Sequence, residues 1–464
     1  MARLPQPGGD QGTWGSVLND YLSVAHNPDG SLKDLPFNVK DYGAKGDGIT
    51  DDTVAIQNTI NAANALSNVS KYKGAGQVYI PPGFYKVSDT ILINNAATLM
   101  IRGAGSWTTQ IVPTAGVAGK AVFKFQDCYY CGLSDLWVSG YTPAPPECGV
   151  ESRVENAGSP GGTFSPTGLR LERLTIGTAG VLNMNYGIKW TCKDAQHDFN
   201  NDLGIIREIR MLYPTKAGVY IGHSNSVSHL FERCQFATPT AFELHGGSVI
   251  ASSCQFSGAT PKSGGGYWQP LGWIVDCEDG NYNYTSGTIR LMNCQAEGAS
   301  SVFKTTANAF GVRMDVINSV FGSAPTGTDI INWSSQSIGT QSRLTITGGL
   351  LGGAPGTGIF FNDVKTRVLF EGVNLSAATI AWKGGLTLFN NWHEPGSVTL
   401  SPGPSATLTQ IGDGGGAFGD AATGYMSGDM RMEVPGKGLI LKSPNGTRYK
   451  IAVSDTGTVT STKV

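Results

Sequence analysis

Short apolar segments recur along most of the chain, separated by polar and glycine-rich stretches. Nine five-residue segments align on a central apolar or small residue, at intervals of about 20–40 residues. The central and final positions of a segment share one side of a strand and are mostly apolar or small, whereas the fourth is often polar. Each segment is therefore predicted to be a short strand with one buried side. The central residues are Leu136, Leu174, Ile209, Cys234, Cys254, Cys294, Ser319, Gly349 and Val373.

Short strands that recur with loops of variable length are typical of a parallel β-solenoid, in which stacked coils bury a face that no coil could bury alone. The pattern predicts such a solenoid over residues 35–395. Its inward cysteines, Cys234, Cys254 and Cys294, would form a ladder of buried, reduced thiols, because their side chains point the same way. The pattern predicts no role for Cys128, Cys131, Cys148, Cys192 or Cys277.

A helical pattern marks residues 1–34 as a separate module. Apolar residues at Trp14, Val17, Leu18, Tyr21 and Leu22 form one stripe of a short helix. A helix of about 12 residues is marginal alone in water. We therefore expect the stripe to be buried on sister chains or on another protein.

A second helical pattern follows the sequence GITDDT. Thr50, Asp51 and Asp52 precede apolar residues at helical spacing. Adjacent carboxylates can perform acid–base chemistry, but Thr and Asp also accept hydrogen bonds from the free N–H groups of a first helical turn. We interpret these three residues as a structural cap.

The last part of the chain, residues 396–464, changes character. A stretch rich in glycine, proline and serine precedes alternating segments with turn sequences between them. This pattern predicts a linker and a small β-meander. Such a meander is too small to hold a core alone, so we expect it to assemble with copies of itself.

The composition narrows the class of protein. Among 464 residues there are 64 glycines, charged residues make up only 15%, and the formal net charge is −2. These values favour a turn-rich all-β protein and give no basic footprint for nucleic acid. No apolar run is long enough to span a membrane, and the first residues lack the apolar region of a secretory signal.

The stretch DYGAKGDGITDDTVAIQNTINAA, followed by GQVYIPPGFYKV, resembles the N-terminal signature of the pectate-lyase-like superfamily. That superfamily includes polygalacturonases, polysaccharide lyases and bacteriophage tailspikes. The resemblance implies an all-β, right-handed, single-stranded parallel β-helix whose first coil carries a capping helix.

The two ends of the chain resemble minor tail proteins of actinobacterial phages and prophages. This resemblance rests on LPQPGGDQGTWGSVLNDYLSVAHNPDGSLK and KGLILKSPNGTRYKIAVSDTGTVTSTKV. It implies attachment to other tail or baseplate proteins through residues 1–34, and trimerisation or distal binding through the C-terminal module. The protein would then be a homotrimer in the virion, made in the host cytoplasm and released by lysis.

Candidate site residues come from the superfamily's motifs and from two acidic clusters. Asn200-Asn201-Asp202 and Gly222-His223 match parts of the polygalacturonase pattern, whose remaining motifs are missing. The catalytic candidates are Asp198, Asp202, His223, Asp276 and Glu278. The candidates for stacking against sugar rings are Tyr267, Trp268, Trp273 and Tyr282. The alternative is that these acids are solvated loop residues and the aromatics seal a loop or a subunit contact.

The resulting hypothesis is a phage tail fibre or tailspike that binds host-surface polysaccharide. Two alternatives stay open: an active depolymerase, either glycoside hydrolase or lyase, and a non-catalytic structural or adhesive tail protein. No cofactor is expected, although a lyase could require a divalent cation such as calcium. A free-standing cellular pectinase is disfavoured by the ends of the chain.

Overall fold

The computed structural model describes most of the chain. The described residues are 4, 6–25, 36–65, 76–155, 167–178, 183–193, 201–257, 273–281, 288–297, 302–324, 329–334, 342–362, 366–389, 391–393, 398–402, 407–411, 439–442, 447–453 and 457–463.

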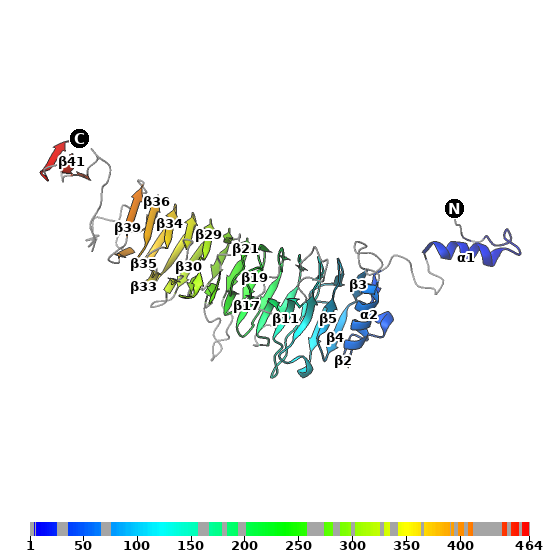
Figure 1. Cartoon of the computed structure of the whole chain (residues 1–464). Coiled ribbons are helices and arrows are strands. Elements are labelled where there is room, and N and C mark those ends of the chain that lie inside the picture. Colours follow the sequence, from blue (N-terminus) through cyan, green and yellow to red (C-terminus); the bar gives the residue numbers. More distant parts are fainter. Residues whose placement is uncertain are drawn as a thin grey trace.

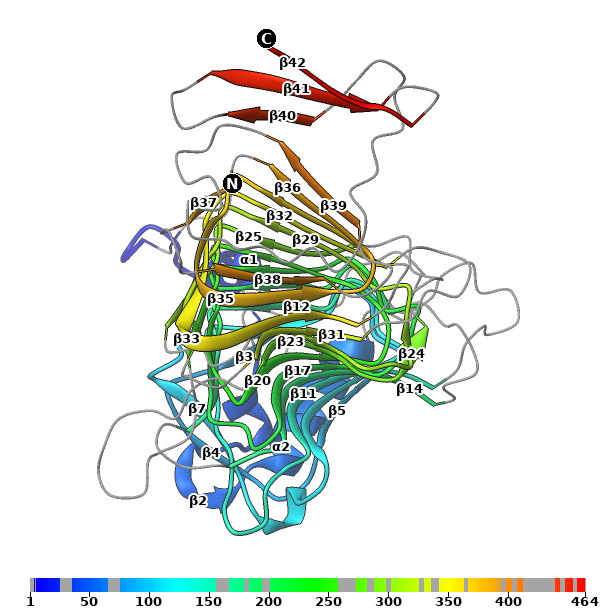
Figure 2. The same cartoon turned by 90° about the vertical axis from the view of Figure 1, so that its left-hand side faces the viewer.

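Most strands pair in parallel with the equivalent strands of the coils before and after, which produces a right-handed parallel β-helix with three long faces (Figure 1; Figure 2). Face 1 is a 14-stranded sheet. Its strands are β1 (Phe37–Asn38), β3 (Gln77–Ile80), β6 (Met100–Gly103), β9 (Gly132–Ser134), β12 (Arg170–Glu172), β15 (Ile205–Arg207), β18 (His229–Glu232), β21 (Val249–Ser252), β25 (Ile289–Met292), β29 (Arg313–Ile317), β32 (Arg343–Thr347), β34 (Arg367–Glu371), β36 (Gly385–Phe389) and β39 (Thr407–Ile411).

Face 2 follows face 1 within each coil. Its strands are β2 (Asp47–Asp51), β4 (Gly83–Val87), β7 (Thr109–Pro113), β10 (Trp137–Val138), β13 (Thr175–Gly177), β16 (Arg210–Leu212), β19 (Gln235–Ala237), β22 (Gln255–Ser257), β26 (Gln295–Glu297), β30 (Val320–Ala324) and β37 (Trp392–His393). The first parts of β33 (Leu350–Phe361) and β35 (Asn374–Trp382) continue this face.

Face 3 completes each coil. Its strands are β5 (Ile91–Asn94), β8 (Ala121–Gln126), β11 (Cys148–Val154), β14 (Tyr186–Cys192), β17 (Ala217–Ile221), β20 (Thr240–Leu244), β23 (Trp273–Cys277), β27 (Phe303–Thr305), β31 (Asp329–Trp333) and β38 (Val398–Pro402), together with the later parts of β33 and β35. A short parallel pair, β24 (Gly280–Asn281) and β28 (Ala309–Phe310), lies outside the three faces.

The core is one continuous apolar cluster along the inside of the coils. Strand alternation directs every second side chain inward, where stacking coils exclude water. Phenylalanines from the three faces of one coil meet there: the rings of Phe231, Phe236 and Phe242 lie 5.0–6.1 Å apart, and Phe256 of the next coil lies 5.2 Å from Phe236. The fold class predicted from the sequence is confirmed.

Eight of the nine aligned segments bury their central residue, Gly349 being only half-buried, but the segments are not single strands. In each one, the second residue forms the corner between faces 1 and 2 and has a positive φ, and the central residue then turns inward. Non-glycine residues occupy seven of these corners, with φ of 46–57°, at Asp135, Arg173, Glu208, Arg233, Ser253, Asn293 and Asn318. The left-handed conformation is reached here by single residues because one residue must turn the chain from face 1 to face 2 without a loop.

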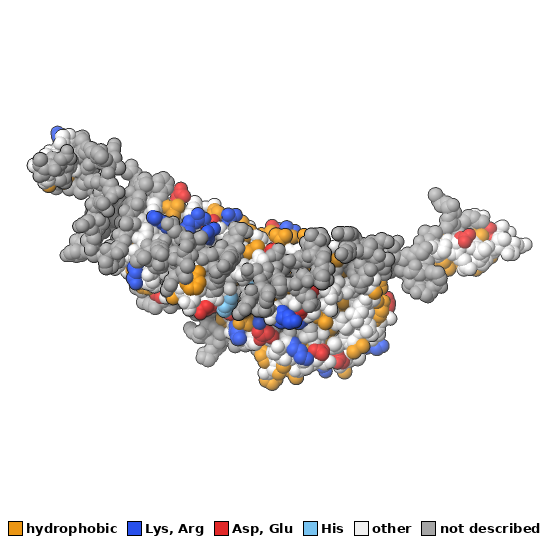
Figure 3. All heavy atoms as spheres, viewed as in Figure 1, with side chains coloured by type: hydrophobic (Ala, Val, Ile, Leu, Met, Phe, Trp, Pro, Cys, Tyr) orange, Lys and Arg blue, Asp and Glu red, His pale blue; other side chains and the backbone are white. Residues whose placement is uncertain are grey.

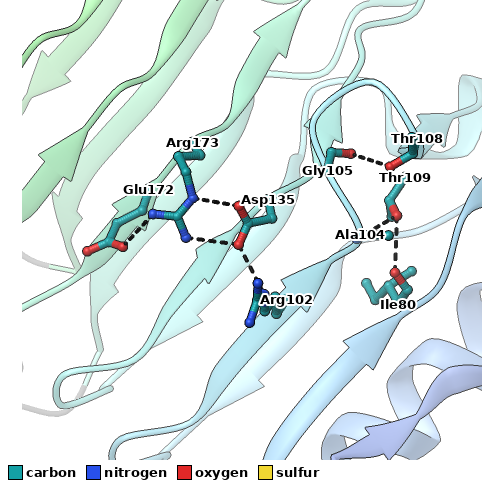
Figure 4. A network of polar contacts seen from close by, with 9 residues as sticks. All are labelled: Ile80, Arg102, Ala104, Gly105, Thr108, Thr109, Asp135, Glu172 and Arg173. Atoms are coloured by element: carbon teal, nitrogen blue, oxygen red, sulfur yellow. Dashed lines mark hydrogen bonds and ion pairs between the residues drawn. The ribbon is translucent and has the colours of Figure 1, made fainter.

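Charged side chains at neighbouring corners pair along the axis of the β-helix (Figure 4). Asp135 accepts hydrogen bonds from Arg173, Nε to Oδ1 at 2.6 Å and Nη2 to Oδ2 at 2.9 Å, and Arg102 Nε lies 3.2 Å from the same carboxylate. Since these arginines are exposed, each pair is worth about 0–1 kcal/mol.

The predicted cysteine ladder is confirmed. All eight cysteines are free, and Cys234, Cys254 and Cys294 are each 2% exposed at successive inward positions. Each of these thiols donates to a backbone carbonyl of the adjoining coil, as Cys254 does to Phe231 O at 3.5 Å. Cys128 and Cys131 are also buried.

A helix covers the N-terminal end of the β-helix. In α2 (Thr53–Ala65), Ile56, Ile60 and Ala63 are buried against the first coils. The short 3₁₀ helix η1 (Val39–Tyr42) precedes it, and a second, η3 (Ala115–Val117), lies before β8.

The acidic residues before α2 hold the helix start and the preceding loop. Asp51 Oδ1 accepts from the backbone N–H of Thr53 at 3.0 Å. Asp52 is 1% exposed, and its carboxylate accepts from the N–H groups of Lys45 (2.6 Å) and Gly46 (2.9 Å). The Thr50 hydroxyl donates to Asp47 rather than to the helix. These hydrogen bonds support the structural role predicted for this stretch.

We expect the double variant Asp51→Asn, Asp52→Asn to lower the free energy of unfolding by about 2–3 kcal/mol, because two buried charge-assisted bonds are weakened. Any glycan activity of the folded fraction should be unchanged. Thermal unfolding measures the effect, and the exposed Asp41→Asn is the matched control. A stable double variant that has lost only activity would contradict the structural role.

The parallel pairing continues beyond the boundary expected at residue 395. Strand β38 pairs with β35, and β39 pairs with β36, so the β-helix extends at least to Ile411. The strands were mistaken for linker because proline, serine and glycine flank them. Further on, β40 (Leu439–Lys442), β41 (Arg448–Val453) and β42 (Val459–Lys463) form an antiparallel meander.

At the other end, α1 (Trp14–Ala25) forms as the apolar stripe predicts and lies apart from the β-helix (Figure 1). Trp14, Tyr21 and Leu22 on this stripe are 52%, 40% and 39% exposed. What covers the stripe stays a prediction.

Candidate functional site

One outward side chain from each of seven successive coils forms a row along face 3. The neighbouring inward positions, such as Val150, Val219 and Phe242, are fully buried, so alternation turns the residues between them to the outer side of the sheet. In register, these residues are Lys124, Glu151, Lys189, Tyr220, Glu243, Asp276 and Lys304. We call them the charged row. Parallel strands lie about 4.8 Å apart, so the row is about 29 Å long.

Three residues at the C-terminal end of the row form a compact ionic cluster. Lys304 Nζ lies 2.9 Å from Asp276 Oδ2 and 2.7 Å from Glu278 Oε1. Asp276 is only 8% exposed, and its Oδ1 makes no hydrogen bond with the part of the chain that the structure describes. Burial raises the pKa of Asp276 to about 6, although Lys304 opposes the rise. This carboxyl can therefore exchange a proton near neutral pH.

Histidine and tyrosine side chains adjoin the cluster. His245 Nε2 lies 3.2 Å from Glu243 Oε1, and this hydrogen bond raises the pKa of the imidazole. The Tyr220 ring lies 5.1 Å from His245 and 5.1 Å from Tyr186, whose hydroxyl donates to Glu243 at 3.3 Å. In Figure 3, acidic, basic and histidine side chains lie near one another on the lower part of the molecule, where Figure 1 labels β17.

A lysine links the aromatic pair to the middle of the row. Lys189 Nζ lies 4.8 Å from the Tyr186 ring centre, 4.7 Å from that of Tyr220, and 2.6 Å from Glu147 Oε1. Burial raises the pKa of both tyrosines, so their hydroxyls stay neutral and can donate hydrogen bonds. The row therefore combines ring faces, cations and carboxylates over several coils.

This arrangement suits acid–base chemistry on a sugar polymer. Glycoside hydrolysis uses two carboxyl groups whose environments separate their pKa values. Asp276 is a proton donor of raised pKa, and Glu243 and Glu278 are nearby carboxylates. An elimination would instead need a base and a cation to neutralise an acidic sugar, roles open to His245 and Lys304.

The structure brings together some of the predicted site residues. Asp276 and Glu278 share Lys304, and the half-buried Trp273 begins the same strand. Asp202 lies before β15 on face 1, where its Oδ1 accepts from Val227 N at 3.0 Å, and His223 is buried after β17. The catalytic assignment of Asp202 and His223 stays a prediction. Asp198, Tyr267, Trp268 and Tyr282 lie outside the described residues.

The sequence interpretation missed every member of the row except Asp276, and it also missed the adjoining Tyr186 and His245. A signal was present: a single polar residue follows an apolar one at the third position of GIKW, GVYI, AFEL and VFKT. Aligning the chain on these residues as well as on the corner segments would have found the row.

No group of three or more His, Cys, Asp or Glu residues is placed to hold a metal ion within the described ranges. Between Asp276 and Glu278, where a divalent cation would be held, the Lys304 ammonium supplies the positive charge. The residues of this cluster therefore do not fit a calcium site. Among the described helices, none has the length and hydropathy to cross a membrane.

Comparisons with known proteins agree with the fold. Residues 36–138 match the family described as rhamnogalacturonase A/epimerase, pectate lyase-like. A stretch of the chain is 54% identical over 137 residues to the mannuronan C5-epimerase AlgE6 of Azotobacter vinelandii, covering 24% of this chain and 15% of that protein. The chain thus spans well under two thirds of that relative.

Two solved structures share the β-helix at low sequence identity. The A-module of the Azotobacter vinelandii mannuronan C-5 epimerase AlgE4 has a TM-score of 0.52 at 17% identity, covering 80% of this chain and 99% of that one. The tailspike gp49 of Acinetobacter baumannii bacteriophage Fri1, a capsular polysaccharide depolymerase, has a TM-score of 0.52 at 12% identity, covering 91% and 70%. These likenesses concern the fold.

Proposed function

Because the chain is a right-handed parallel β-helix of the pectate-lyase-like kind, we propose that it binds and cleaves a host-surface polysaccharide along the charged row, as a phage tail fibre or tailspike. The observation that carries the proposal is the row itself. It presents ring faces, cations and a protonatable Asp276 on one face of seven stacked coils. Proteins with this fold include a phage depolymerase and polysaccharide epimerases.

The virion role rests on the ends of the chain. The apolar stripe of α1 is exposed and would attach to other tail proteins, while the C-terminal meander would join three copies. The protein would then be a homotrimer carried on the phage tail. Probing purified particles with an antibody against the chain tests this role, and particles without the protein would refute it.

The polysaccharide role is tested with the host's purified envelope polysaccharide. Incubation with the chain should reduce the polymer's size and generate new ends. New reducing ends without unsaturation identify a hydrolase, and unsaturated ends identify a lyase. A polymer that is bound but keeps its size would instead favour the adhesive alternative, which the pairing of both carboxylates with Lys304 supports.

We further propose that cleavage needs no divalent cation. Since the Lys304 ammonium already lies between Asp276 and Glu278, where a cation would bind, we expect dialysis against EDTA to leave the cleavage rate within about twofold of the untreated protein. The rate is measured as reducing or unsaturated ends formed, before and after calcium is restored. A loss with EDTA that calcium reverses would contradict the proposal.

A further inference from the structure

A second surface lies on face 2 and differs from the charged row in chemistry. The strands β7, β10, β13, β16, β19 and β22 hold a single charged residue, Arg210. The charged row crosses the equivalent strands of face 3 with a charged residue on nearly every coil. Two sides of the same coils are therefore built for different contacts.

An exposed indole marks the N-terminal part of this surface. The Trp107 side chain is 67% exposed, an unfavourable state for so large an apolar group. Its ring packs edge-on against Trp137, with centres 5.4 Å apart, and Trp137 Nε1 donates to Gly177 O at 2.7 Å. The Arg210 guanidinium lies 5.9 Å from the Trp107 ring. The exposed ring is thus held in place rather than left free to rotate.

Amide side chains continue the surface along the axis. Trp137, Thr175, Arg210, Gln235 and Gln255 occupy the same position on five successive coils, and of these five only Thr175 is buried, at 1% exposed. Arg210 Nε donates to Gln235 Oε1 at 3.1 Å, and Gln235 and Gln255 approach within 3.5 Å. The rungs are about 4.8 Å apart, close to the length of one pyranose residue.

We propose that this indole–amide surface, formed by Trp107, Trp137, Arg210, Gln235 and Gln255, is a second glycan-binding site for an uncharged stretch of sugar polymer. An exposed ring face suits stacking on the apolar face of a sugar, and amides both donate to and accept from hydroxyls. Within the strands of this surface Arg210 is the one charged residue, and the charges of the corners beside it are paired, so contacts to ring faces and hydroxyls would dominate the binding. The inference rests on the proposed function, because this surface would be a second binding site for the same polysaccharide.

The test uses the full chain carrying Asp276→Asn, which is expected to slow cleavage by about 100-fold or more, and the host's purified envelope polysaccharide immobilised on a sensor. Adding Trp107→Ala should raise the apparent Kd about tenfold, and Gln235→Ala with Gln255→Ala should raise it several-fold. The ratio of the Kd of Trp107→Ala to that of its parent should not change with salt between about 0.05 and 0.5 M, because the contacts of the indole involve few charges. Trp14→Ala, another exposed tryptophan, is the matched control.

Two results would overturn the inference, and a third separates it from the proposed function. An unchanged Kd in Trp107→Ala removes the surface as a binding site. A lower mass of Trp107→Ala by light scattering identifies the surface as a contact between copies instead. If the unmodified chain neither binds nor cleaves the polysaccharide, the proposed function itself fails.

Discussion

Replacing Asp276 with asparagine is expected to slow glycan cleavage by about 10²- to 10⁴-fold, the usual contribution of a positioned general acid. The amide keeps the shape of the side chain and can still accept from Lys304, which also keeps Glu278 as a partner. Folding should therefore survive while the transferable proton is lost. Initial rates of new end formation, beside a thermal unfolding curve, measure both.

The matched control is Asp315→Asn on face 1. Asp315 is also a largely buried carboxylate paired with basic side chains, 3.1 Å from Arg343 Nη2 and 3.7 Å from Arg290 Nε. We expect the cleavage rate of Asp315→Asn to stay within about twofold of that of the unmodified chain, because Asp315 lies on face 1, away from the charged row. Equal rates for all three proteins would remove Asp276 from the chemistry.

The raised pKa of Asp276 also sets a pH dependence. As an acid the carboxyl must be protonated, so cleavage should decline as the pH rises above about 6. A carboxyl with a folded pKa near 6 and an ordinary value of 3.8 contributes stability below pH 3.8 and loses it as the pH rises through 6. Relative to Asp276→Asn, the unmodified chain should lose up to about 3 kcal/mol of unfolding free energy between pH 4 and 7.

The second large effect is expected at Gly132, in β9 of face 1. A Cβ added there would lie 1.9 Å from Arg170 O, a backbone atom of the next coil. No side-chain rotation relieves that contact, so the coils must separate locally. We expect Gly132→Ala to lower the free energy of unfolding by about 3 kcal/mol or more.

Denaturant unfolding measures the free energy of unfolding of Gly132→Ala, and the matched control is Gly322→Ala in β30. At Gly322 the nearest atom to an added Cβ is Leu350 Cδ2, at 3.1 Å, the mobile end of a side chain. That variant should lose no more than about 1 kcal/mol. If both variants lose the same amount, backbone contact between coils is not what restricts Gly132.

The inward positions were predictable because burial selects apolar residues whatever the local backbone. Leu136, Ile209 and Val373 are fully buried, as the aligned segments indicate. The corners were not predictable in the same way. Arg173 and Glu208 adopt a conformation that glycine and asparagine favour, because stacking of the coils overrides their local preference.

The candidate site was predicted only in part, for a related reason. Asp276 and Glu278 stand close together in the acidic stretch IVDCEDGN, so the sequence alone indicated them as candidates. Lys304 lies 28 residues from Asp276 in the sequence, and Glu243 lies 23 residues from its row neighbour Tyr220. Only the register of coil stacking brings them together, and that register follows from backbone pairing rather than from side-chain type.

Each coil contributes one position to the charged row, one corner and one rung of face 2 at the same time. Duplication or loss of a whole coil in the gene would therefore lengthen or shorten both outer surfaces together by one step. The remaining coils would keep their contacts, because each touches only its neighbours. The length of the glycan-contacting surfaces could therefore evolve to match a host's sugar repeat while the residues that contact the glycan stay the same.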